Sequence, residues 1–134
     1  MYRHSAKLLL AALLCAGCSA ARATDLYVIC NSRVSLTAAD LRDLFLGEKQ
    51  FAGVLKLIPV DNGVAQIAFL EKVLKMNAAK YSTAWTKKSF RDGLIPPIVV
   101  GSDAETIGYV KRTPGACSYV TTPGAADVVV ISRL

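Results

Sequence analysis

The chain has 134 residues, of which 16 are lysine or arginine and 10 are acidic, so its formal net charge is +6. This length excludes more than one typical domain, and the sequence contains no internal repeat or low-complexity tract. Residues 24–134 alone carry a net charge of +3, which is too modest to indicate nucleic acid as a partner.

The N-terminal segment has the three parts of a signal peptide for export. Basic residues between positions 3 and 7 precede an apolar run over 8–16, and Ala21 and Ala23 occupy the −3 and −1 positions of a cleavage site. The apolar run is much shorter than the ~20 residues that a membrane helix needs. We therefore predict a signal peptide over 1–23, a mature domain over 24–134, and a periplasmic or secreted location.

Cys18 offers a second way to process the same segment. Together with the preceding Cys15-Ala16-Gly17 it resembles a bacterial lipobox, in which the cysteine is lipidated and becomes the first residue. Such an anchor would tether the domain to a membrane without changing its fold. The sequence leaves this lipoprotein form open beside the form cleaved before Thr24.

Cleavage at residue 23 would change the chemistry of the chain. It removes Arg3, Lys7 and Arg22, which lowers the net charge to +3, and it removes His4, the only histidine. A mature chain without histidine cannot use Ser-His-Asp or Cys-His nucleophiles or histidine-containing zinc sites. We find no paired catalytic carboxylates and no metal-ligand cluster either, so we predict a non-enzymatic protein without a cofactor. The two remaining cysteines, Cys30 and Cys117, could form a disulfide or stay as buried thiols.

Strands and helices alternate along the mature chain. We expect a strand over 25–30, a helix over 37–47, a strand over 54–60, a helix pair over 64–93, a strand over 98–100, a helix over 102–112, and strands over 117–120 and 128–131. Thr37 with Asp40, and Ser102 with Glu105, form capping boxes, and Asn77 can begin the second helix of the pair. This order predicts an α/β fold, a single domain with a mostly parallel sheet and helices packed on it.

The helix pair carries an apolar face and many basic residues. We expect Ile67, Phe69, Tyr81, Trp85 and Phe90 to pack in the core rather than to form an aromatic platform for a ligand. The basic residues favour a solvated outer face, with a docking surface for an acidic partner or anionic lipid as the alternative. They are Lys72, Lys75, Lys80, Lys87, Lys88 and Arg91.

Small polar residues follow three of the predicted strands. In an open α/β sheet, ligands bind beyond the carboxyl ends of the strands, and free N–H groups at helix starts favour an anion there. The candidate ligand-binding residues are Asn31, Ser32, Asn62, Gly63 and Ser102. The alternative is that these residues only form ordinary caps and turns.

Several segments resemble the phosphate ABC-transporter substrate-binding protein family, which has the periplasmic binding-protein-like fold. The segments LTAADLRDLFLGEKQF (36–51) and GSDAETIGYVKRTPGACSYV (101–120) carry most of the likeness, which extends from about Leu26 to Val120. The resemblance implies a small, one-lobed, secreted solute-binding protein with phosphate or a similar oxyanion as ligand. It also implies an ABC permease or another membrane or periplasmic protein as partner.

The sequence departs from the family at its phosphate-binding segment, Arg-x-x-x-Ser-Gly-Thr. When Phe69 is placed on the family's phenylalanine, Pro59 falls on the arginine and residues 63–65 fall on Ser-Gly-Thr. Backbone N–H groups would then be the remaining donors to an anion. One lobe would also leave half of a ligand exposed. Three alternatives follow: the affinity is weak, a second copy in a homodimer supplies the other wall, or the domain has become an accessory or sensory module that acts through protein contacts.

Overall fold

The computed structural model describes residues 25–122 and 127–134. The predicted signal peptide, its cleavage site and Cys18 lie outside these residues. In chain order the elements are β1 (Tyr27–Asn31), the 3-10 turn η1 (Ala38–Asp40), α1 (Leu41–Phe45), β2 (Phe51–Ala52), β3 (Leu55–Lys56), β4 (Ile58–Pro59), β5 (Asp61–Asn62), α2 (Gln66–Phe69), the π-helical turn η2 (Leu70–Leu74), α3 (Ala78–Asp92), β6 (Val99–Val100), α4 (Asp103–Arg112), β7 (Ala116–Val120) and β8 (Val128–Arg133).

The main sheet has four strands in the order β4-β7-β1-β8. The α/β class predicted from the sequence is confirmed, but the expectation of a mostly parallel sheet is wrong in detail. β1 runs antiparallel to both β7 and β8, and parallel pairs occur at β4–β7 and β5–β6. β1 pairs with strands from the far end of the chain. These strands are not linked to β1 by a single β-α-β crossover, which is the connection that makes successive strands parallel.

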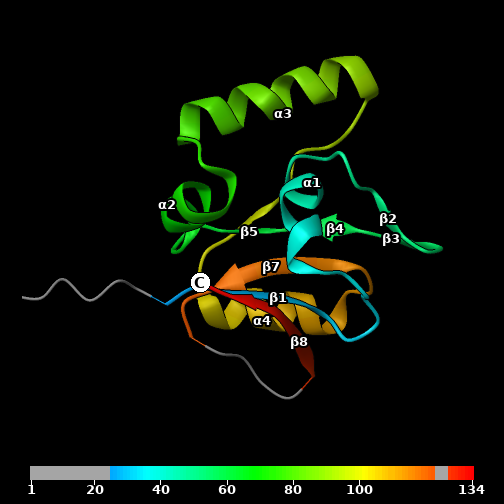
Figure 1. Ribbon diagram of the computed structural model, residues 1–134, viewed down its shortest axis with the longest axis vertical. Coiled ribbons are helices and arrows are strands. Elements are labelled where there is room, and N and C mark those ends of the chain that lie inside the picture. Colours follow the sequence, from blue (N-terminus) through cyan, green and yellow to red (C-terminus); the bar gives the residue numbers. More distant parts are fainter. Residues whose placement is uncertain (1–24, 123–126) are drawn as a thin grey trace, which may run out of the picture.

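Helices cover both faces of the main sheet (Figure 1). α4 lies on one face, where Val110 packs with Ile29, Ala116 and Val120. The larger core fills the other face, beneath α1, α2 and α3. The stacked rings of Phe69 and Tyr119, with centroids 4.0 Å apart, lie in this larger core. These two apolar layers hold the strand ends in place.

The helix starts agree with the sequence prediction. The backbone N–H of Thr37 donates to the Asp40 carboxylate at 3.0 Å. The Asn77 side chain accepts from the N–H of Lys80, and the Ser102 hydroxyl accepts from the N–H of Glu105. The strand expected over 54–60 is instead divided into β3 and β4, because residues 51–56 fold back as the β2–β3 hairpin.

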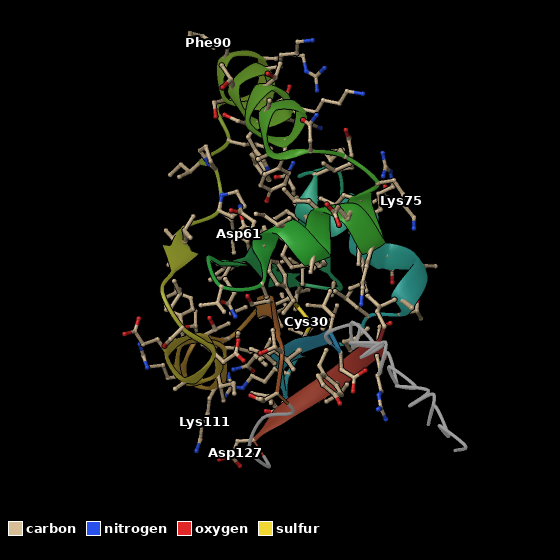
Figure 2. The ribbon with its side chains drawn as sticks, turned by 90° about the vertical axis from the view of Figure 1, so that its left-hand side faces the viewer. Cys30, Asp61, Lys75, Phe90, Lys111 and Asp127 are labelled. Carbon is tan, nitrogen blue, oxygen red and sulfur yellow. A yellow bond between two sulfur atoms is a disulfide. The ribbon has the colours of Figure 1, made fainter. Side chains whose placement is uncertain are left out.

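Two side chains expected in the core are exposed. Phe90 is 89% exposed and Ile67 is 72% exposed. α3 stands away from the sheet, and Figure 2 shows Phe90 at the end of the molecule farthest from Lys111. Only the side of α3 that carries Tyr81, Trp85 and Lys88 is buried, because no layer covers the outer side. The strand β6 is also on the surface, where Val99 is exposed.

Cys30 and Cys117 form a disulfide. They are register partners on β1 and β7, and both are fully buried. The bond joins residues 87 positions apart, so in the chain-entropy view it stabilises the fold by about 4.6 kcal/mol. Among the residues that the structure describes, no helix is long and apolar enough to cross a membrane.

Candidate functional site

The five candidate residues lie at two different places. Because β1 is antiparallel to β7, its carboxyl end lies at the C-terminal end of α4 rather than at the N-terminal end. The Asn31 amide there donates to the carbonyl oxygens of Val110 and Lys111 at 2.9 and 3.1 Å, and its own oxygen accepts from the N–H of Arg33. The Asn31 side chain thus caps the C-terminal end of α4. Ser32, the next residue, is exposed.

Asn62, Gly63 and Ser102 lie together at the other end of α4, which is about 15 Å long. β5 and β6 are parallel, with Asn62 opposite Val100, and the N–H of Gly63 donates to the Val100 carbonyl at 2.8 Å. Ser102 follows β6 closely and caps α4. We name this group the strand-end site. Its members come from two parallel strands that stop at one helix start.

Asp103, the first residue of α4, also belongs to the strand-end site, although the sequence interpretation did not include it. The buried Asn62 amide donates to one oxygen of its carboxylate at 2.7 Å. The other oxygen accepts from the N–H and hydroxyl of Thr121 and from the hydroxyl of Thr122. In the sequence, an Asp directly after a capping serine indicates only a helix start. The residues that donate hydrogen bonds to Asp103 lie 41, 18 and 19 positions away, so the local sequence does not indicate them.

The hydrogen bonds to Asp103 outweigh the effect of its partial burial. Burial raises the pKa of the carboxyl. The hydrogen bonds from Thr121, Asn62 and Thr122 lower it by more, so the pKa lies below its ordinary value. Asp103 is therefore a carboxylate at neutral pH. It occupies donors that a bound anion would otherwise use.

A second carboxyl group lies directly beneath this site. Asp61, just before Asn62, is buried and accepts hydrogen bonds from the hydroxyls of Tyr81 and Tyr119, each at 2.8 Å. Burial raises its pKa, although both hydrogen bonds act in the opposite direction. Tyr81 comes from α3 and Tyr119 from β7, so Asp61 joins three elements and holds the end of β5 in place.

The strand-end site brings together polar side chains from β5, α4 and the end of β7. No group of three or more histidine, cysteine, aspartate or glutamate side chains that could hold a metal ion occurs in the described part of the chain. The side chains that meet here are amide, hydroxyl and carboxylate groups. Groups of these kinds donate and accept hydrogen bonds.

No family model matches this chain, and a search of curated proteins finds no match. Several solved structures resemble it, including the following two. An ABC-type phosphate transport receptor from Vibrio cholerae has 14% identity and a TM-score of 0.48 over 79% of this chain and 44% of its own. PstS from Borrelia burgdorferi has 18% identity and a TM-score of 0.52 over 71% of this chain and 39% of its own. The chain thus spans less than half of either structure, and the likeness to PstS shows a periplasmic binding-protein-like fold.

Proposed function

We propose that this chain works outside the cytoplasm as a non-enzymatic, solute-binding-like protein. The observation that carries the proposal is the meeting of the carboxyl ends of β5 and β6 at the N-terminus of α4, within a fold similar to that of PstS. The buried disulfide between Cys30 and Cys117 supports an oxidising compartment. It agrees with the signal peptide predicted from the sequence.

We propose Asn62, Gly63 and Ser102 as the ligand-binding residues and a small oxyanion, such as phosphate, as the ligand. The N–H groups and the positive end of the helix dipole at the start of α4 favour an anion. The Asp103 carboxylate repels the same ligand and already receives the hydrogen bonds of Asn62 and Thr121. We therefore expect weak binding, in which the oxyanion competes with Asp103. Asn31 and Ser32 are left out, because they lie at the opposite end of α4.

Titration calorimetry with phosphate and sulfate, on wild type and on Asp103→Asn, tests this ligand class. Asparagine removes the negative charge and one acceptor oxygen, so we expect at least a tenfold gain in phosphate affinity, equivalent to about 1.4 kcal/mol. Glu105→Gln is the matched control, because it removes a charge from the same helix turn without contacting Asn62. Absence of heat with both the wild type and Asp103→Asn at millimolar anion would rule out the oxyanion.

A second candidate function is an accessory or sensory module that acts through protein contacts. The observation that favours it is the exposed apolar surface of β6 and the segment before it, where Ile95, Ile98 and Val99 are 87%, 49% and 60% exposed. Its partner would be an ABC permease, another membrane or periplasmic protein, or a second copy of the chain. A Val99→Asp variant that keeps every partner and the same oligomeric state in crosslinking experiments would contradict this function.

A further inference from the structure

An apolar groove of about 360 Å³ lies apart from the strand-end site. One wall is the connection from α3 to β6, with Leu94 and Ile98, and the other is the segment Leu57–Pro59 around β4. Trp85 from α3 and Tyr109 from α4 also line it. Neither Asn62 nor Asp103 belongs to its lining, so it is a separate site.

Two lysines add positive charge to this apolar groove. Lys49 and Lys56 both line it, and both come from the base of the β2–β3 hairpin, where the N–H of Leu57 donates to the Gln50 carbonyl. The lining contains no acidic side chain. Within residues 25–122 and 127–134, neither lysine forms an ion pair.

We propose that this groove binds a small amphipathic carboxylate, such as a free medium-chain fatty acid. An aliphatic chain would lie along Leu57, Ile98 and the ring of Trp85, where burial of apolar surface is favourable. The carboxylate would accept charge-assisted hydrogen bonds from Lys49 and Lys56. The volume lies within the range of about 300–1,000 Å³ that is usual for small-molecule sites.

The inference shares with the proposed function the premise of a solute-binding-like fold, and it goes beyond that function because it names a solute for a separate site. It concerns different residues, however, and a different ligand class from the oxyanion at the strand-end site. The two sites can therefore be tested on one sample. Phosphate affinity reports on the strand-end site, and decanoate affinity reports on the groove.

Trp85 provides a direct measurement, because it is the only tryptophan of the chain and it lines the groove. Titration of the exported protein with sodium decanoate, below its micelle concentration, is expected to change the Trp85 fluorescence in a saturable way. Decanol has the same chain without the charge and is expected to bind about tenfold more weakly, the equivalent of about 1.4 kcal/mol. Calorimetry on the same solutions checks both affinities.

The double variant Lys49→Met and Lys56→Met keeps the apolar stems and removes both charges. We expect it to lose about tenfold in decanoate affinity and nothing in decanol affinity. Lys87→Met is the matched control, because Lys87 is exposed on α3 and does not line the groove. Ile98→Asp places a negative charge at the wall and is expected to abolish decanoate binding.

Absence of a saturable fluorescence change and of heat with wild-type protein would overturn the groove proposal. Equal decanoate affinity in the wild type and the double lysine variant would overturn the carboxylate class, since it would mean that only the apolar walls bind. If decanoate does not bind but phosphate binds to Asp103→Asn, the proposed function is supported and the groove proposal is contradicted. If phosphate does not bind but decanoate does, the oxyanion proposal is contradicted and the groove proposal is supported.

Discussion

The Asn62 amide donates to the Asp103 carboxylate over 2.7 Å and joins the end of β5 to the start of α4. The same amide donates to the Tyr119 carbonyl at 3.0 Å, and the Asn62 oxygen accepts from the N–H of Val64. The Asn62 side chain is therefore fully used and fully buried. An oxyanion would therefore have to displace the Asp103 carboxylate before it could accept a hydrogen bond from Asn62.

Stability should depend on pH through Asp103. Its folded-state pKa is below the ordinary value, so the folded protein releases this proton more readily than the unfolded chain. Its stabilising contribution is present above the unfolded pKa of about 3.9 and is lost as pH falls through the lower folded pKa. The measurement is urea unfolding of wild type and Asp103→Asn at a series of pH values from pH 3 to pH 7, which spans the unfolded pKa. The variant should lose less stability at low pH than the wild type. Parallel curves would contradict this.

Asp61 should act with the opposite sign. Its pKa is raised by burial, so the folded protein holds the proton more tightly than the unfolded chain. This contribution favours folding below the unfolded pKa of about 3.9 and is lost as pH rises through the folded pKa. The Asp61→Asn variant should therefore lose less stability than the wild type as pH rises through this range. Thermal melts across the pH range measure the effect, and an unchanged slope would count against a raised pKa.

Tyr81→Phe should loosen the contact between α3 and β5. It removes one of the two phenol donors to the buried Asp61 carboxyl, and an unsatisfied buried acceptor costs about 1–3 kcal/mol. Denaturant unfolding measures the loss. Tyr27→Phe is a suitable control because Tyr27 makes no contact with Asp61, and equal stability of both variants would contradict the role of Tyr81.

Replacement of both Cys30 and Cys117 by alanine should destabilise the fold by about 2–5 kcal/mol. The disulfide joins the central strand β1 to β7 and is buried on both sides. Chemical denaturation should give the same result for the double variant and for the wild type reduced in denaturant. Wild-type protein that refolds equally well with a reducing agent would argue against a structural role for the bond.

Processing of the N-terminus should follow one of the two predicted routes. Intact mass measurement of exported protein should give a chain that begins at Thr24, and Cys18→Ala should leave this mass unchanged. A mass that contains acyl groups on Cys18, with membrane association lost in Cys18→Ala, would instead support the lipoprotein form. A chain that retains residues 1–23 without acylation would contradict both routes.

Local signals in the sequence predicted local structure well. Asn77 and Ser102 begin α3 and α4 as expected, and Gly47 and Gly93 adopt a positive φ just after α1 and α3. These features depend on hydrogen bonds between residues three or four positions apart, so a short segment contains all that they need. The same holds for the alternation of strands and helices that predicted the α/β class.

The sequence by itself determined most element types, the helix caps and the absence of histidine from residues 24–134. Only the tertiary structure decided which strand ends meet. The antiparallel direction of β1 separates Asn31 from Asn62, and it aligns Cys30 with Cys117. The Asp103 donors, the Asp61 pair of tyrosines and the exposure of Phe90 likewise depend on elements far apart in the chain. Such contacts follow from strand pairing and layer packing, which no periodicity within one segment records.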